Sequence, residues 1–572
     1  MKLDTFFDNF GLLADAPNGV QKLREMILQL AVQGNLVPQD PKDEPASVLL
    51  EKIKAEKERL IKEGKIKKTK PLPSIKPGEI PYEIPIGWEW IRLGEMGFTQ
   101  TGTTPSKSNP AYFGKYIPFI KPADIFENSV NYENEGLSKQ GLKHGRLIES
   151  NSVLMVCIGG SIGKVNFIER ACSCNQQINT ITLYAGILYN LLNYFMRSPY
   201  FQNEVVSRAP KTTLPIISKG KWELIPTPLP PANEQKRIVA KVDKLMALCD
   251  ELEVRKQQVS KNCIQLNDAS IHKLLTARKP KKFNKHWQRI CDNFDLLYNK
   301  LENVTKLRQA ILQLAVQGKL VPQNPKDEPA SVLLEKIKTE KDRLIKEGKI
   351  KKSKPLPPIN PDEISYELPN GWEWVRLSIL CETITKGSSP KWQGVNYVDS
   401  SDGILFITSE NVRNYYLKLD KAKYVEVKFN KIEPRSILKR NDILMNIVGA
   451  SIGRTAFFDL EEVANINQAV CLIRMLNTNR FFEMKYFLYF FNSPVCIGYM
   501  FDKQVDNARP NLSMTNISQF AIPFPSKNEQ KRIVAKVDQL MVLCDELETS
   551  LSQSQKDCNR LMEATVAEIL AA

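Results

Sequence analysis

Polar residues that could contact a nucleic acid occur in two sets, which follow each other in the same order along the chain. Each set has a loop of small polar residues, a glycine-rich turn ending in lysine or arginine, and an Asn-Gln pair. Basic side chains neutralise phosphates, hydroxyls contact phosphates or bases, and amides can read adenine in the major groove. We therefore predict two DNA-contacting surfaces. Their candidate residues are Thr103, Thr104, Ser106, Lys121, Ser161, Lys164, Asn175, Gln176 and Lys211 in the first set, and Lys386, Ser388, Ser389, Lys391, Ser451, Arg454, Asn467, Gln468, Arg509 and Asn511 in the second.

Two of these motifs also have simpler interpretations. Ser161-Ile162-Gly163-Lys164 and Ser451-Ile452-Gly453-Arg454 each follow an apolar run, as a tight β turn would, because glycine permits a positive φ. Neither is a P-loop: in the first, Ile158 and Val165 stand where that motif requires Gly and Ser or Thr. The two Asn-Gln pairs could cap turns instead of contacting bases.

No set of residues has the spacing of a catalytic or metal site. Asn109-Pro110-Ala111-Tyr112 is a near match to the Asn-Pro-Pro-Tyr motif of adenine methyltransferases, but it lacks the second proline and a preceding glycine cofactor loop. A nuclease motif built from Pro361-Asp362 and Glu426-Val427-Lys428 has no counterpart in the first set. The three histidines and eleven scattered cysteines lack zinc-ligand spacing, so we expect free, mostly buried thiols. The sequence predicts a non-catalytic chain that binds neither metal nor cofactor itself.

The length and charge of the chain limit its class. It has 572 residues, with 80 Lys and Arg against 64 Asp and Glu, which gives a formal net charge of +16. At roughly 150 residues per domain, we expect about three to four folding units, and the positive charge favours a polyanionic partner. The first eleven residues carry Asp4 and Asp8 and lack a signal-peptide pattern, and no apolar run is long enough to span a bilayer. We therefore expect a cytoplasmic protein without membrane contact.

An internal repeat organises the chain. Leu23–Leu93 returns as Leu307–Leu377 with 57 of 71 positions identical, and NEQKRIVAKVD begins at Asn233 and again at Asn528. The segments between these shared blocks, 94–231 and 378–526, agree only at scattered landmarks. We call the shared blocks the frame and the segments between them the inserts. A plain duplication would leave the frame and the inserts equally alike in the two copies, so the inserts were exchanged or selected for difference. We predict that each insert has its own target.

The shared block after each insert has the pattern of a long helix. Apolar residues recur at alternating spacings of three and four over four heptads, which is typical of a coiled coil. About 40 residues would form a rod of roughly 60 Å, and a partner of equal length is present in the same chain. An ordinary core helix is the alternative. The predicted seam residues are Ile238, Val242, Leu245, Cys249 and Leu252 in the first helix, and Ile533, Val537, Leu540, Cys544 and Leu547 in the second.

Each insert combines short runs rich in β-branched and aromatic residues with a closing helix, near 188–198 or 482–493. The predicted fold class is α+β: two similar small domains separated by a long two-helix coiled coil, with an internal pseudo-repeat. The predicted boundaries are 1–86 for an N-terminal helical segment and proline-rich linker, 87–231 for the first α+β domain, 232–370 for a central helical region and linker, 371–526 for the second α+β domain and 527–572 for a C-terminal helix.

The chain resembles the specificity (S) subunits of type I restriction-modification systems. The resemblance rests on GWEWIRL with GTTPS, the Gly-Ser-Ile-Gly-Lys turn, PLPPANEQKRIVAKVD from Pro228, and LRQAILQLAVQGKLVPQ. These motifs extend over nearly the whole chain, and their order repeats twice. Compared with many members, the order of elements resembles a cyclic shift, because a near-complete copy of the helical end opens the chain.

The resemblance implies a specific division of labour. Two target-recognition domains, held apart by antiparallel helices, would each bind one half of a split, asymmetric site in double-stranded DNA. Two modification (M) subunits would use S-adenosylmethionine to methylate adenine at N6, and restriction (R) subunits would use ATP and Mg to cleave unmethylated DNA. A structural coiled-coil adaptor that binds proteins alone is the alternative function. Inserts with hydrophobic patches and without basic or amide-rich loops would favour that alternative.

Overall fold

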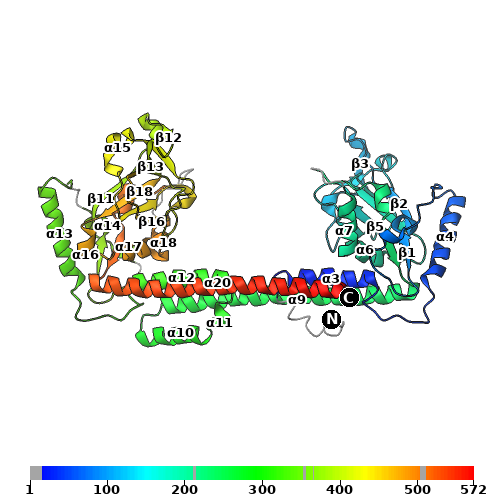
Figure 1. The fold of residues 1–572 in the computed structure, drawn as a ribbon, viewed down its shortest axis with the longest axis horizontal. Helices are drawn as coiled ribbons and strands as arrows, with labels where there is room; N and C mark the ends of the chain where they lie inside the picture. The colour runs from blue at the N-terminus through cyan, green and yellow to red at the C-terminus, as the bar shows by residue number, and fades with distance from the viewer. Residues whose placement is uncertain (1–15, 210–213, 352–355, 365, 503–510, 572) are drawn as a thin grey trace. The chain divides into compact units, whose positions relative to one another are not determined.

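The computed structural model describes residues 16–209, 214–351, 356–364, 366–502 and 511–571 (Figure 1). The chain divides into two compact units: unit 1 is Met1–Ser260 with Ser554–Ala572, and unit 2 is Lys261–Gln553. Two long helices, α9 (Ala232–Leu275) and α20 (Lys527–Ala571), contribute residues to both units. None of the helices in the described ranges is both long and apolar enough to cross a membrane.

Unit 1 contains an α+β domain built on a four-stranded antiparallel sheet with the order β2-β8-β5-β6. A smaller sheet, β4-β3-β7, includes the parallel pair β3–β7. Strand β5 is buried along its whole length, as its sequence SVLMV predicts. The elements before α9 are α3 (Gly19–Gln33), α4 (Ala46–Lys62), β1 (Glu89–Arg92), β2 (Gly97–Thr101), β3 (Phe113–Ile120), β4 (Gly136–Leu137), α5 (Lys139–Leu142), β5 (Ser152–Val156), β6 (Val165–Phe167), β7 (Ser173–Cys174), β8 (Ile178–Leu183), α6 (Tyr189–Arg197), α7 (Pro199–Arg208), α8 (Lys219–Glu223) and β9 (Pro226–Leu229).

Unit 2 repeats this plan with a larger second sheet. Its antiparallel sheet has the order β11-β18-β15-β16, and the second sheet, β12-β14-β13-β17, again includes one parallel pair, β13–β17. The elements are α10 (Pro280–Asp292), α11 (Phe294–Leu297), α12 (Leu301–Val316), α13 (Ala330–Lys346), β10 (Glu373–Arg376), α14 (Leu377–Leu380), β11 (Cys381–Lys386), β12 (Tyr397–Val398), β13 (Gly403–Ile407), β14 (Lys423–Glu426), α15 (Lys428–Ile432), β15 (Asp442–Asn446), β16 (Thr455–Phe458), β17 (Ala464–Ile466), β18 (Val470–Met475), α16 (Thr478–Phe481), α17 (Met484–Phe491), α18 (Pro494–Asp502), α19 (Met514–Ser518) and β19 (Ala521–Phe524).

A two-stranded antiparallel ribbon, which we call the closing ribbon, joins the start of each domain to its end. In unit 1, β1 pairs with β9 and sets Arg92 opposite Pro226. In unit 2, β10 pairs with β19 and sets Arg376 opposite Ala521. Because the first and last strands of the domain meet, the chain enters and leaves the domain at one place. This arrangement explains how the inserts can differ while the frame stays the same.

The arginine of the closing ribbon in unit 1 ties the proline-rich linker to the domain. The Arg92 guanidinium donates to the carbonyls of Pro73 and Ser74, both at 3.1 Å, and of Leu224 at 2.6 Å. It also forms a bidentate pair with Glu79, with both N–O distances at 2.8 Å. This hydrogen-bonded pairing lowers the pKa of Glu79 to about 2. The linker, which the prolines predict to be extended, is therefore fixed to the domain.

The second copy repeats this device around Arg376. Its guanidinium donates to the carbonyls of Pro357, Pro358 and Gln519 at 3.3, 2.8 and 2.6 Å. Glu363 accepts two further bonds, at 2.6 and 2.9 Å, and this pairing lowers its pKa to about 2. This shared role explains why both copies, GWEWIRL and GWEWVRL, contain the arginine.

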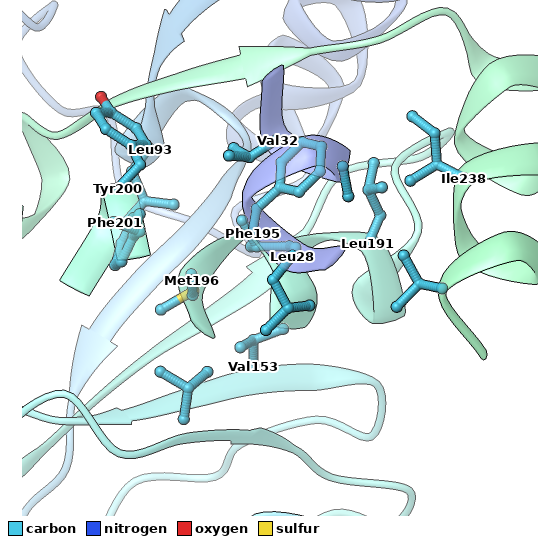
Figure 2. Close-up of a cluster of buried hydrophobic side chains, with 14 of the residues drawn as sticks. Leu28, Val32, Leu93, Val153, Leu191, Phe195, Met196, Tyr200, Phe201 and Ile238 are labelled. Carbon is cyan, nitrogen blue, oxygen red and sulfur yellow. The ribbon is translucent and has the colours of Figure 1, made fainter. Parts of the chain in front are cut away.

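The seam residues of α9 lie in the hydrophobic core of unit 1. Ile238, Val242 and Cys249 are fully buried and share this core with side chains of α3 and α6. Figure 2 shows Ile238 beside Leu191 of α6, with residues of α3 in the same cluster. Among the other seam residues, Leu245 is buried and Leu252 half-buried. In this unit, the seam joins the long helix to the domain.

In unit 2, the first part of α20 has the equivalent position. Ile533, Val537 and Cys544 are buried in one core with α12 and α17, and Leu540 and Leu547 are half-buried. Within this unit, α20 and the end of α9 run in opposite directions beside α12 (Figure 1). The predicted fold class, repeated α+β domains with long connecting helices, is confirmed. The sequence does not predict that α3 and α12 cover much of each seam.

Candidate nucleic-acid interface

In both domains, the loop of small polar residues is fixed against the turn that carries the Asn-Gln pair. Gly102 follows β2 and its N–H donates to Ile178 at 2.9 Å. A Cβ on Gly102 would lie 2.1 Å from the carbonyl oxygen of Asn175, and one on Gly387 would lie 1.8 Å from that of Ile466. Only glycine fits such a close approach of two backbones. The structure therefore brings together two of the three predicted motifs in each domain.

In domain 1, Thr104 and Gln176 meet at this contact. The Thr104 hydroxyl donates to the Gln176 side-chain oxygen. Thr104 is half-buried and Gln176 is exposed, so the pair lies at the surface. Thr103 is half-buried and bonded through its backbone to Cys174, and the exposed Ser106 contacts Ser108 at 2.7 Å. This loop pair presents hydroxyl and amide groups of the kind that contact bases and phosphates.

The two asparagines of the Asn-Gln pairs hold the turns. Asn175 is buried, accepts a hydrogen bond from the backbone N–H of Gln177 at 3.1 Å and donates to its side-chain oxygen at 2.9 Å. Asn467 accepts from the backbone N–H of Ala469 at 3.0 Å. The capping alternative therefore describes both asparagines. In domain 1 the exposed Gln176 is better placed for an outside contact than the buried Asn175, whereas Asn467 and Gln468 of domain 2 are both half-buried.

The glycine-rich turns lie in a different part of each domain. Gly159 and Gly163 adopt φ values of 94° and 89°, which a tight turn requires. Lys164 is exposed and lines a hollow of 360 Å³ beside Gln21 and Arg24 of α3. The lining of this hollow does not include the Thr104–Gln176 loop pair. Lys164 therefore lies near helix α3 and apart from the Thr104–Gln176 contact.

The equivalent turn in domain 2 has the same local structure. The Ser451 hydroxyl donates to the Val448 carbonyl at 3.3 Å, and Arg454 is exposed. Ser161, the counterpart of Ser451, accepts through its carbonyl from the Lys164 N–H at 3.2 Å. Both serines take part in turn hydrogen bonds.

The remaining predicted residues have varied surroundings. Lys121 is ion-paired with Glu135, so its charge is already neutralised. Ser388 is buried and accepts from the Gln393 amide at 3.0 Å. The exposed predicted residues are Lys386, Lys391 and Asn511, and the half-buried ones are Ser389 and Gln468. Lys211 and Arg509 lie outside the described residues.

The structure adds a group of basic and aromatic side chains in domain 1, around β3, β4 and α5. The Tyr112 ring lies 4.5 Å from that of His144, Lys139 Nζ lies 5.3 Å from the centre of the Tyr116 ring, and Arg146 donates to the Thr101 carbonyl at 2.7 Å. The exposed basic residues of the group, none of which has an ion pair with another described residue, are Lys107, Lys115, Lys139, Lys143 and Arg146. The DNA-contacting residues predicted from the sequence do not include this group. The signal that could have indicated it is the set of basic residues interleaved with aromatic side chains along 107–116 and 139–146.

Domain 2 presents a different surface in the corresponding sheet. Several of its basic residues are neutralised, including Lys423 by Glu410 at 3.4 Å and Lys428 by Glu426 at 2.9 Å. Its exposed aromatics include Trp392, which is 75% exposed and directly follows Lys391 in sequence. The two domains thus combine one scaffold with different surface chemistry.

Comparisons with known proteins identify the family. A model of the type I restriction modification DNA specificity domain matches residues 85–261 and 369–554, which together are more than half of the chain. The specificity subunits of the type I restriction enzymes EcoAI and EcoEI of Escherichia coli are each 32% identical to this chain over 96% of its length and 93% of theirs. The chain belongs to this family. A solved HsdS subunit from Thermoanaerobacter tengcongensis is 18% identical, with a TM-score of 0.43 over 86% of this chain and 98% of that one.

Specificity subunits of this family recognise DNA and are not the catalytic subunits of their systems. Within the described ranges, this specificity subunit has no group of three or more His, Cys, Asp and Glu side chains that could hold a metal ion. Nine of its eleven cysteines are buried free thiols, and Cys291 and Cys558 are exposed. The two matched ranges of the specificity family leave out 262–368, which contain α10 to α13.

Proposed function

We propose that this specificity subunit directs a type I restriction-modification complex to an asymmetric, two-part sequence in double-stranded DNA, with one part read by each domain. One observation carries the proposal. Both domains have the closing ribbon and a small polar loop that a glycine, Gly102 or Gly387, holds against the Asn-Gln turn, which we call the glycine-docked loop, yet the two domains present different side chains. Domain 1 offers Thr104 and Gln176, whereas domain 2 offers Lys386, Ser389 and Gln468. Equal frames with unequal surfaces support two unlike half-sites at a spacing that the helices fix.

The chemistry of these surfaces supports a division between affinity and sequence readout. The unpaired basic residues of domain 1 would neutralise phosphates, which supplies affinity without sequence preference. Hydroxyl and amide groups on the glycine-docked loops would contact base edges, which supplies specificity. The predicted domain boundaries, 87–231 and 371–526, are part of this proposal.

Two kinds of protein partner follow from the proposal. Two modification subunits would bind S-adenosylmethionine and methylate adenine at N6, and restriction subunits would use ATP and Mg to cleave unmethylated DNA. The specificity subunit would bind no cofactor and would act in the cytoplasm. Exposed apolar residues on the long helices support protein docking there, notably Val254 at 67% and Val259 at 60% on α9 and Val542 at 54% on α20.

The experiment that tests this function is a genome-wide map of N6-methyladenine. Cells with this gene and its neighbouring methyltransferase gene would be compared with cells in which this gene alone is deleted. We expect a split, asymmetric methylated motif that disappears on deletion and returns when the gene is restored.

An unchanged map, with the complex shown to be expressed, would contradict the proposal. The apolar residues exposed on the long helices would then favour the adaptor alternative. A catalytically inactive methyltransferase subunit is the matched control, because it removes the mark without removing this chain.

A further inference from the structure

Helix α10 separates its basic residues from its apolar residues more sharply than its neighbours do. Phe283 and Trp287 stack with their ring centres 6.3 Å apart, and Ile290 is buried in a cluster with Leu274 and Leu314. In Figure 1, the long helices of unit 2 lie between α10 and the sheets of that unit. One face of α10 is therefore fixed to the helical frame, and the other faces away from the domain.

The outward face of α10 carries a row of basic side chains, which we call the basic ridge: Lys281, Lys282, Lys285 and Arg289. At 3.6 residues per turn, these four residues fall within an arc of about 100°. All four are exposed, and none forms an ion pair or side-chain hydrogen bond with any described residue. Arg278 and Lys279, also exposed, directly precede the helix. From 278 to 291 the chain contains no acidic residue.

We propose that the basic ridge binds the phosphate backbone of duplex DNA outside the two recognition domains, without reading sequence. Lys281 and Arg289 are eight residues apart, or about 12 Å along the helix. Over that length, one strand of B-DNA presents about three to four phosphates. The ridge thus matches a phosphate row in both spacing and charge.

The composition of the ridge favours DNA over an acidic protein surface. The centres of protein interfaces are depleted of lysine and enriched in aromatic residues and methionine. The ridge has lysine and arginine only. The aromatic residues of α10 are on the opposite face, where Phe283 packs against the buried cluster and Trp287 is 39% exposed. Lysine and arginine on an exposed face are what non-specific phosphate contacts require.

Two basic residues of the ridge do not recur in the internal repeat. The shift of 284 residues that relates the two frames sets Met1 opposite Lys285 and Thr5 opposite Arg289. The ridge also lies outside both ranges that match the specificity-domain model. This contact therefore goes beyond the recognition of two half-sites and would add affinity for DNA of any sequence.

The test is the salt dependence of binding to a random-sequence duplex, measured with the full chain and its partner subunits. The ridge variant is Lys281→Gln, Lys282→Gln, Lys285→Gln and Arg289→Gln. Each lost phosphate contact should reduce the slope of log affinity against log salt by about 0.9, so we expect a slope smaller by about 3 to 4. The matched control removes four exposed lysines from α4 and α13: Lys54→Gln, Lys62→Gln, Lys338→Gln and Lys346→Gln.

The outcomes separate this inference from the proposed function. A reduced slope in the ridge variant alone, with an unchanged methylated motif, would support the inference. An unchanged slope in the ridge variant would overturn the inference. If the slope is unchanged and the variant loses a partner subunit, the ridge binds an acidic protein surface and not DNA. If the wild-type complex bound no duplex at all, the inference and the proposed function would both fail. Far-UV circular dichroism would show that the variants keep their helices.

Discussion

Arg92 and Arg376 hold segments that the sequence shows only as proline-rich linkers. Each is about 4% exposed at its side chain and satisfies several carbonyls and one carboxylate at once. Removing the carboxylate would leave a buried guanidinium without its countercharge, which is costly. The paired glutamates are therefore the residues at which pH should act on stability.

Glu363→Gln should destabilise the protein in a pH-dependent way. The pKa of Glu363 falls from 4.5 to about 2 on folding, so its ionised form stabilises the folded state above about pH 4.5. That contribution is lost as the pH falls from 4.5 towards 2. We expect Glu363→Gln to lower the free energy of unfolding by about 1–3 kcal/mol at pH 7, and by roughly half as much near pH 3, where a carboxyl with a pKa of about 2 is still mostly ionised. Thermal unfolding at both values measures this difference.

The matched control for this pH effect is Glu367→Gln, which removes an exposed carboxylate from the same segment. It should leave stability nearly unchanged at both pH values. An equal loss of stability in Glu363→Gln at pH 7 and pH 3 would show that the effect does not come from the ionised pair.

Gly102→Ala should damage the domain 1 surface through the backbone. The new Cβ would meet two carbonyl oxygens, at 2.1 and 2.4 Å, and neither can move without shifting the turn behind it. We expect a loss of about 1–3 kcal/mol in the stability of domain 1 and weaker methylation of the target. Gly220→Ala is the control, because a Cβ there meets nothing within 4 Å. A Gly102→Ala protein with wild-type melting and methylation would contradict the docking of the two loops.

At the scale of the elements, apolar periodicity predicts the long helices and the buried face of each. It cannot show what covers that face. The four-and-three spacing fits a helix partner of equal length as well as it fits α3, α6 and the other helices of unit 1, because burial alone sets the pattern. For the same reason, Lys121 reads as a DNA candidate in the sequence although Glu135, fourteen positions away, neutralises it in the fold.

Apolar runs and helical periodicity predict other elements well. The closing helix expected near 188–198 is observed as α6 (Tyr189–Arg197), and the apolar run that precedes the Ser161 turn contains β5. The basic and aromatic group of domain 1 was missed because it comes from separate segments. Only the pairing of β3 with β4 brings Tyr116 near Lys139.

Leu245→Asp should detach α9 from its unit. Leu245 is 5% exposed in the core of unit 1, so the substitution would bury an unpaired carboxylate at a cost of several kcal/mol. We expect domain 1 to lose its fixed position on the helix and the complex to fail to assemble. Limited proteolysis and size-exclusion chromatography would detect these changes. Gln257→Asp, at an exposed site on the same helix, is the control. Normal assembly of Leu245→Asp would show that the seam does not support the frame.

At the scale of the whole molecule, two domains on repeated frames should make separable contributions to the target. Gln176→Ala is expected to relax one part of the methylated motif by about 1–3 kcal/mol of base discrimination, and Gln468→Ala the other part. Methylation maps of the two variants would show which positions become degenerate. If both variants relax the same positions, the two domains do not read separate half-sites.

The closing ribbon also bears on how the chain folds while it is being made. Domain 1 can close only after Leu229 has emerged, because Leu229 pairs with Glu89. At that moment, the second frame has not yet been synthesised. In a completed chain, β19 would compete with β9 for β1, because β1 (EWIR) differs at one position from β10 (EWVR), the strand that β19 pairs with. Synthesis from the N-terminus gives β9 its correct partner before the competing strand exists.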